Sequence, residues 1–250
     1  MRVSLRPSKI TLFEQLESDL AGMDGEVGVD AASAAFKSYP YFRTRSYYGV
    51  DIDKSALQQG LHDHPEGIAL LADVTDLDLP SGSVDVCVST NTLNWFGHDK
   101  RLQALAELTR IVAPHGWLVL ELDCDRFLPE ALVLLRARFE VVEVCYYGNR
   151  LCQAYESRLV SWVDVNRRAR GLVGTVLLGL ARIVSLTDRM SASAKGRTHA
   201  YVRCHWRSDD TEPASFVVDE SLKVADGMYA LNGSGDDRPQ QSVRPATAGP

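Results

Sequence analysis

The stretch Tyr47-Tyr48-Gly49-Val50-Asp51-Ile52-Asp53 decides the fold. It opens with apolar and aromatic residues and ends with two carboxylates, after which Lys54 begins a helix-forming segment. A parallel strand is almost continuously apolar when helices cover both of its faces. An acid at the end of such a strand lies on the edge where open α/β sheets bind their ligands. The stretch therefore predicts a parallel sheet with Asp51 at its ligand edge.

The two acids of this stretch have different expected roles. Asp51 ends the strand, where its carboxylate can accept two hydrogen bonds from a ribose diol. Asp53 directly precedes the helix, where its side chain can cap the helix by accepting from an otherwise unpaired amide. The alternative is that both acids only cap the helix and neither touches a ligand.

The composition is typical of a soluble globular protein. The chain has 250 residues, enough for one large domain or two small ones, and is 45% hydrophobic and 24% charged. Its net charge of −6 argues against general nucleic-acid binding. The five cysteines form no CxxC pair and no zinc spacing, which favours reduced thiols in a cytoplasmic protein. We expect no signal peptide and no segment of the ~18 uncharged apolar residues that span a membrane.

Strands and helices alternate on both sides of the opening stretch. Apolar periodicity predicts helices over 8–22, 54–62, 99–112 and 128–139. Apolar runs predict strands over 23–29, 47–53, 68–72, 84–89, 117–122, 139–147 and 199–206. Such alternation implies right-handed crossovers and a parallel sheet with helices on both faces.

The predicted fold is a doubly wound α/β domain with a mostly parallel seven-stranded sheet. Its last two strands are expected to form an antiparallel hairpin at one edge. We divide the chain into an N-terminal helix (1–22) and a main domain (23–207) that contains a helical insertion (148–197). Residues 208–250 are acidic and rich in glycine and proline, and are expected to form a disordered tail.

Four segments, in order along the chain, resemble class I S-adenosylmethionine-dependent methyltransferases of the type 11 group. They are YGVDID at 48–53, ADVTDLDLP at 72–80, SVDVCVSTNTL at 83–93 and LAELTRIVAPHG at 105–116. The resemblance extends over roughly residues 23–147 and on to the last strand. It implies a Rossmann-like methyltransferase fold and S-adenosyl-L-methionine as the cofactor.

The resemblance also implies a role for individual residues. Asp51 would hold the ribose hydroxyls. Asp73 would approach the adenine amine, with Val74 supplying a backbone contact. Asn91 would line the floor below the sulfonium.

The sequence departs from the family in the first loop. The family has an acid, an apolar residue and a Gly-x-Gly turn after its first strand, because the backbone approaches the ligand closely there. Glu26 and Gly28 are the predicted acid and first glycine, and Asp30 stands at the next glycine position. Either the loop is reshaped and still binds the cofactor, or the site has decayed and the protein is a binding or scaffold module.

The resemblance implies methyl transfer to a small-molecule, glycan or lipid-linked acceptor. A hydroxyl acceptor would need a general base. His98, just after the fourth strand, is the nearest candidate, although a surface role at a helix start is the more common one for such a histidine.

The insertion has a charge opposite to that of the whole chain. Residues 148–197 hold nine Arg and Lys against three acids, and the basic run 167–170 leads into the apolar run 171–184. A basic cluster beside an apolar helix fits peripheral contact with a membrane through residues 158–190, or a cover over an anionic lipid-linked acceptor. The alternative is a helical lid that packs on the sheet or on the second subunit of a homodimer.

Overall fold

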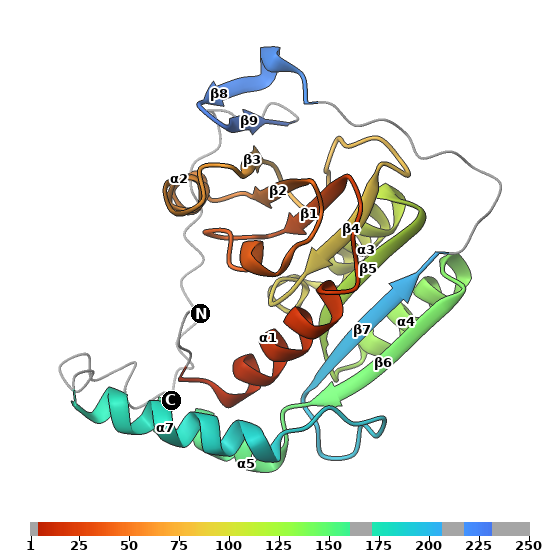
Figure 1. Ribbon diagram of the computed structural model, residues 1–250. Coiled ribbons are helices and arrows are strands. Elements are labelled where there is room, and N and C mark those ends of the chain that lie inside the picture. Colours follow the sequence, from red (N-terminus) through yellow and green to blue (C-terminus); the bar gives the residue numbers. More distant parts are fainter. Residues whose placement is uncertain (1–4, 161–171, 207–217, 232–250) are drawn as a thin grey trace.

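A single mixed sheet organises the part of the chain that the computed structural model describes, residues 5–160, 172–206 and 218–231 (Figure 1). Its strands lie in the order β6-β7-β5-β4-β1-β2-β3-β9-β8. Their bounds are β1 Val27–Ala31, β2 Ser46–Asp51, β3 Ile68–Leu71, β4 Val84–Ser89, β5 Val112–Asp123, β6 Val141–Tyr147, β7 His199–His205, β8 Lys223–Ala225 and β9 Met228–Ala230.

The pairing confirms the predicted doubly wound, mostly parallel sheet. β1 pairs in parallel with β2 and β4, β2 with β3, and β4 with β5. β7 is antiparallel to both of its neighbours, β5 and β6. The two last predicted strands are therefore an antiparallel pair at one edge, as expected, with β7 inserted between β5 and β6.

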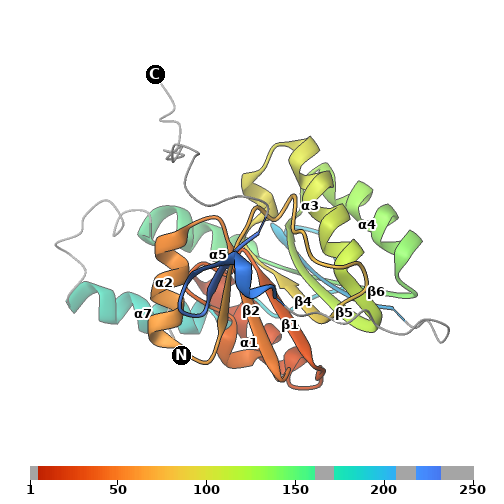
Figure 2. The ribbon, with the colours of Figure 1, turned by 90° about the horizontal axis from the view of Figure 1, so that it is seen from above.

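Helices cover both faces of the sheet. Their bounds are α1 Pro7–Leu20, α2 Lys54–Asp63, α3 His98–Ile111, α4 Phe127–Arg138, α5 Arg150–Tyr155 and α7 Leu172–Thr187. Figure 2 shows α3 and α4 on one side of the sheet, and α1 and α2 on the other. Each face has its own buried core, because successive strand residues point to opposite sides.

The connection between β1 and β2 contains no crossover α-helix. Residues 32–45 form turns and one short 3₁₀ helix, η1 (Tyr39–Tyr41). The sheet face beside this connection is covered by α1, which precedes β1 in the chain. Leu12, Leu16 and Leu20 of α1 are fully buried in the same core as the aromatic side chains of the connection. The N-terminal helix is therefore an integral part of the domain.

Two aspartate side chains fix the starts of α2 and β1 through hydrogen bonds to backbone amides. Asp53 caps α2, as predicted, with its Oδ1 accepting from the amides of Ser55 (2.9 Å) and Ala56 (3.2 Å). Asp85, at the start of β4, accepts from the backbone amides of Glu26 (2.8 Å) and Val27 (2.9 Å) and so fixes the start of β1.

The expectation of a wholly disordered tail is wrong for residues 218–231. Here β9 pairs in parallel with β3, and β8 pairs antiparallel with β9, so the sheet has nine strands and not seven. Met228 is fully buried, and the amide of Ala69 donates to the carbonyl of Gly227 (2.7 Å). The sequence shows the short apolar run 228–231 within the polar tail, and this run pairs with the otherwise open edge of β3.

Within the insertion, residues 150–160 and 172–187 are helical and residues 188–197 form a loop. α5 continues into a π-helical turn, η3 (Glu156–Val160), and α7 packs on α1 and α5. The predicted basic run 167–170 lies outside the described residues. No helix in the described ranges has the length and apolar character needed to cross a membrane.

Docking of residues 218–231 on the sheet can be tested by shortening the buried side chain of Met228. Met228→Ala should lower the free energy of unfolding by about 2–4 kcal/mol, because it empties a fully buried position in the core. Val224→Ala in β8, where the side chain is 42% exposed, should change it by less than about 1 kcal/mol. Urea denaturation of the full chain measures both, and equal, small effects would contradict docking of β9.

Candidate active site

The carboxyl ends of β1 to β5 meet at one edge of the sheet, and Asp51 lies there at the end of β2. Its Oδ1 accepts from the amide of Asp53 (2.9 Å) and its Oδ2 accepts from the amide of Ala34 (2.7 Å). The side chain is half-buried. Each carboxylate oxygen has two lone pairs, so Asp51 keeps acceptor capacity for a ligand hydroxyl.

Asp73 follows β3 at the same edge and leaves one carboxylate oxygen open. Its Oδ1 accepts from the amide (3.0 Å) and hydroxyl (2.8 Å) of Thr75, and the structure records no partner for its Oδ2 among the described residues. Val74 is buried beside it. The turn that follows is held by Glu107, whose Oε2 accepts from the amide of Leu77 (3.0 Å).

An exposed apolar side chain lies next to Asp51. Ile52 is 70% exposed, although a large aliphatic side chain is usually buried. Beside a carboxylate at the ligand edge, it offers a surface on which the flat face of a nucleobase could pack. The sequence alone does not reveal this position of Ile52, because a single apolar residue between two acids forms no pattern.

The loop after β1 adopts a backbone that normally requires glycine. Ala32, Ala34 and Phe36 have φ values of 60°, 48° and 53°. In this left-handed region the Cβ of an L-residue is crowded, at roughly 1–2 kcal/mol per residue. The positions that glycine would occupy therefore lie at 32, 34 and 36.

This geometry changes the assignment of the first loop. Asp30-Ala31-Ala32-Ser33-Ala34 is an acid, an apolar residue and an Ala-x-Ala turn, which is the family pattern with alanine in place of both glycines. Glu26 lies before β1, away from the ligand edge, and forms an exposed ion pair with Arg45 (3.3 Å).

Gly28 and Asp30 also lie in places other than the sequence predicts. Gly28 is buried inside β1, where an added Cβ would approach Thr44 Oγ1 to 2.3 Å. Asp30 is buried in the same strand and accepts from the Tyr47 hydroxyl (2.9 Å). Burial raises the pKa of Asp30 to about 6, against the effect of hydrogen bonds from Tyr47 and Ser38. Asp30 therefore lies within β1, and not in the loop that follows it.

The ring of Phe36 fills a space left by three glycines. An added Cβ would approach this ring to 2.2 Å at Gly49, 2.7 Å at Gly60 and 2.9 Å at Gly67. The ring is 1% exposed and meets Tyr47 edge-on at 5.1 Å. The aromatic side chain thus anchors the loop between β2 and α2, and it holds the Ala34 amide against Asp51.

The loop after β4 continues the site toward β5. Asn91 adopts a positive φ of 59°, and its backbone N–H donates to Glu121 Oε2 (2.6 Å). Glu121 is 3% exposed, and its Oε1 accepts from the Tyr147 hydroxyl (2.8 Å). Ser89, the last residue of β4, has a buried Oγ with no hydrogen-bond partner among the described residues. This edge therefore offers an unsatisfied polar atom to a ligand.

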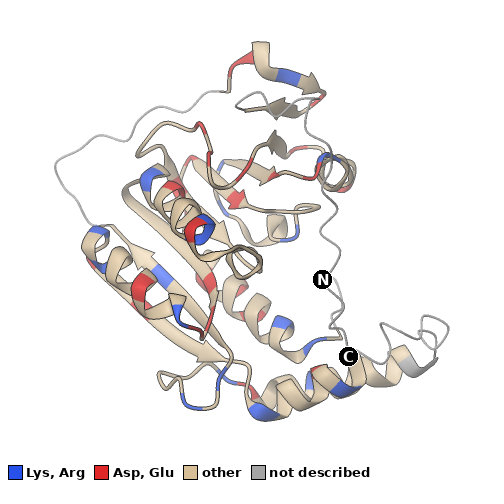
Figure 3. Cartoon of the chain, turned by 180° about the vertical axis from the view of Figure 1, so that it is seen from behind, with Lys and Arg blue, Asp and Glu red and all other residues tan. Residues whose placement is uncertain are grey.

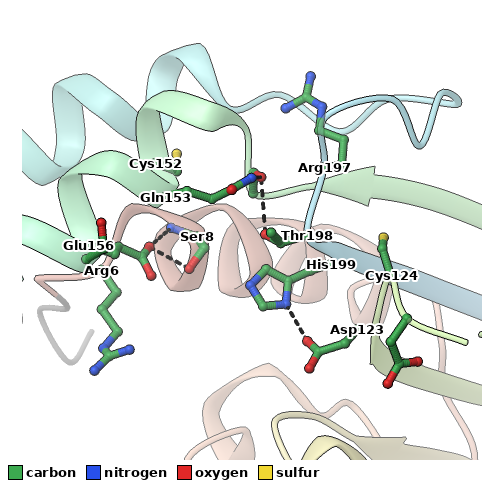
Figure 4. Close-up of a pocket in the computed structure, with 13 residues that line it drawn as sticks. Arg6, Ser8, Asp123, Cys124, Cys152, Gln153, Glu156, Arg197, Thr198 and His199 are labelled. Atoms are coloured by element: carbon green, nitrogen blue, oxygen red, sulfur yellow. Dashed lines mark hydrogen bonds and ion pairs between the residues drawn. The ribbon is translucent and has the colours of Figure 1, made fainter. Parts of the chain in front are cut away.

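A pocket of about 540 Å³ opens at the end of β5, the start of β7 and the start of α1 (Figure 4). His199 and Asp123 lie on one side of it, and Ser8 and Glu156 on the other. Asp123 Oδ1 is 3.1 Å from His199 Nδ1, and Glu121 Oε1 is 3.4 Å from the same nitrogen. The second ring nitrogen of His199 lies on the side away from Asp123.

The surroundings of His199 favour its protonated form. Burial alone would lower the pKa of His199, but the hydrogen bond to Asp123 and the charges of Glu121 and Asp123 outweigh it, and the pKa is raised. Carboxylates on one ring nitrogen orient the other, which is how a catalytic histidine is commonly positioned.

The predicted base, His98, is not among the residues that line this pocket. It begins α3, its side chain is 55% exposed, and it pairs with Glu130 (3.3 Å). His199 has no local signal in the sequence, because its partners come from β5, far away in the chain, and no local spacing reveals the cluster.

Comparisons with known proteins agree with this geometry. Residues 26–120 match the family model described as a methyltransferase domain. The comparison with the curated proteins returned no match. Residues 26–120 are therefore similar to a methyltransferase domain, in agreement with the resemblance seen in the sequence, which implies S-adenosylmethionine as the cofactor.

Solved structures with the same fold have little sequence in common with this chain. A TehB-like S-adenosylmethionine-dependent methyltransferase from Corynebacterium glutamicum is 14% identical, with 78% of this chain and 88% of that chain covered and a TM-score of 0.51. The YcgJ protein from Bacillus subtilis is 11% identical, with 78% and 98% covered and a TM-score of 0.51. A [4+2]-cyclase is 13% identical, with 78% and 80% covered and a TM-score of 0.51. These likenesses show the fold.

The residues present fit the nucleoside part of S-adenosylmethionine. Asp51 and Asp73 each keep acceptor capacity at the ligand edge, Ile52 offers an apolar surface, and the buried Ser89 hydroxyl is unsatisfied. Loop 32–36 departs from the family pattern in two ways. Alanine replaces both glycines, and no crossover α-helix follows before β2.

Replacing alanine by glycine in the loop tests its backbone. Ala34→Gly should raise the free energy of unfolding by about 0.5–1 kcal/mol, because glycine adopts the left-handed region without crowding. Ala35→Gly is the control: Ala35 has no positive φ, so the same change should lower stability by about 0.5–1 kcal/mol. Thermal or urea denaturation decides, and a loss of stability in both variants would contradict the observed loop.

The His199–Asp123 pair can be tested by titration. NMR of the imidazole should give a pKa for His199 above its ordinary value of 6.5, and Asp123→Asn should lower that pKa. Asp125→Asn, which removes the partner of Arg101 in the same loop, should leave it nearly unchanged. An unshifted wild-type titration would show that the carboxylates do not act on His199.

Proposed function

We propose that this protein transfers the methyl group of S-adenosylmethionine to a small acceptor bound in the pocket beside His199. The observation that carries the proposal is the chain of contacts from Asn91 through Glu121 to His199. Asn91 is the residue that the family resemblance places below the sulfonium. His199 lines a pocket large enough for a small molecule, a sugar or a lipid head group.

Bound S-adenosylmethionine would supply an electrophilic methyl group, so that the protein's part is binding, alignment and exclusion of water. Asp51 and Asp73 would hold the ribose and the adenine. Ser89 and Asn91 would line the floor of the site next to β5.

His199 would remove the proton of a hydroxyl or amine acceptor, in place of the predicted His98. Its raised pKa favours the protonated form, so its neutral, basic form would become available at a higher pH than for an ordinary imidazole. In its protonated form, it would also attract an acceptor with a carboxylate or phenolate group. Asp123 and Glu121 would stabilise the imidazolium.

The departure of loop 32–36 from the family pattern supports a second candidate. This candidate is a methyltransferase-like binding or scaffold protein that no longer transfers methyl groups. The backbone amide of Ala34 already donates a hydrogen bond to Asp51 Oδ2. No crossover α-helix follows the loop within residues 32–45. Fold alone does not decide between the candidates, because one fold supports many activities. Cofactor affinity distinguishes them.

Calorimetric titration with S-adenosylmethionine and S-adenosylhomocysteine tests the proposal. The wild type should bind both. Asp51→Ala should weaken binding by about tenfold or more, because it removes hydrogen bonds to a charged acceptor.

Asp53→Ala is the matched control for this titration. It should leave affinity nearly unchanged and lower the free energy of unfolding by about 1 kcal/mol, because Asp53 caps α2. Absence of heat at millimolar ligand for the folded wild type would refute cofactor binding and favour the scaffold alternative.

A further inference from the structure

The outer side of α7 carries an apolar stripe. Val176, Ile183 and Leu186 are 60%, 61% and 72% exposed, and Leu180 is 40% exposed. At 100° per residue, these side chains fall within an arc of about 120°. A surface helix of a globular protein normally has polar residues on this side.

The inner side of α7 already has its packing partners. Leu177 and Ala181 are 6% and 0% exposed and lie in a small core with Tyr155 and Val160. The Tyr155 hydroxyl donates to the carbonyl of Leu177 (2.5 Å). Docking of the helix on α1 and α5 therefore does not explain the outer stripe.

Within residues 148–197, the exposed charged side chains that the structure describes are all basic. Arg182 follows the stripe on the helical wheel, and Arg158 and Arg189 are exposed on the adjoining turns. α5 and α7 each contain one basic residue, Arg150 and Arg182, and both helices carry a basic segment in Figure 3. Across residues 148–197, nine cationic residues stand against three acids, so the rest of a chain of net charge −6 carries −12.

The described acids of this segment are engaged inside the protein. Glu156 accepts from the amide (2.9 Å) and hydroxyl (2.6 Å) of Ser8. Asp188 is fully buried and pairs with Arg197 (2.7 Å). The described surface of the segment therefore offers mainly cations and apolar groups to a partner, because Asp188 is buried and Glu156 is only partly exposed and bonded to Ser8.

An anionic bilayer matches this surface better than a second copy of the chain does. A two-fold dimer brings the same patch of both copies together, and would place arginine-rich borders against each other. Anionic lipid head groups attract arginines, and the acyl boundary accepts the apolar stripe. α7, 16 residues long, is not among helices able to cross the membrane, so it would lie in the plane of the interface.

We propose that α7 docks the protein on the surface of an anionic lipid bilayer, with the stripe in the acyl boundary and the flanking arginines at the head groups. This docking is independent of the proposed methyl transfer, since it uses none of the residues of the candidate active site. The acidic remainder of the chain would face away from the membrane.

Flotation of the full-length protein with vesicles tests the proposal. Vesicles that contain phosphatidylglycerol should carry the protein, whereas pure phosphatidylcholine vesicles should not, and added salt should weaken the binding. The double variant Val176→Ser/Ile183→Ser should reduce partitioning by roughly tenfold or more. Arg182→Glu should reduce it by about fivefold or more.

Matched controls come from α4 on the other side of the sheet. Val133 is 66% exposed and Arg136 is exposed, so Val133→Ser and Arg136→Glu change the same residue types away from α7 and should leave partitioning unchanged. Circular dichroism verifies that each variant is folded.

Two outcomes would overturn the proposal. One is that the wild type and the α7 variants are recovered with anionic vesicles to the same extent, whether all of them bind or none does. The other is a stable dimer of the wild type in sedimentation, in the absence of lipid, that Val176→Ser/Ile183→Ser dissociates, because the stripe would then be an interface between copies.

Discussion

Parallel pairing of the central strands is the constraint on which the site depends. Because β1 to β5 run in one direction, their last residues must meet at a single edge of the sheet. Asp51 and Asp123 come from β2 and β5, which lie on opposite sides of β1, and the strand order still places both at this edge. The antiparallel β7 begins where β5 ends, and so brings His199 to Asp123.

The sequence predicts the elements and acids of this edge well, because both follow from local patterns. Continuous apolar runs mark buried strands, and an acid directly after such a run can only lie at the strand end, as for Asp51. Asp53 was recognisable as a cap from its place before a helix. The histidine of the pocket has no such local signal, since Glu121, Asp123 and His199 meet only through strand pairing.

The first loop shows why residue identity alone can mislead. Glu26 and Gly28 fit the acid and glycine of the family pattern, but the backbone needs its positive φ at 32, 34 and 36, where alanine and phenylalanine stand. Phe36 explains how such a loop persists: its ring is enclosed where Gly49, Gly60 and Gly67 leave space. Packing around the Phe36 ring thus compensates for the backbone crowding at positions 32, 34 and 36. A single sequence does not reveal this compensation.

The central claim is that the carboxyl edge binds an adenosine-bearing cofactor despite the rebuilt loop. Hydrogen–deuterium exchange of the full chain with and without S-adenosylhomocysteine tests it most directly. The account predicts that the ligand slows exchange at residues 32–36, 51–53 and 73–75, while α4 on the far side of the sheet is unaffected. Unchanged exchange at all three segments under saturating ligand would contradict it.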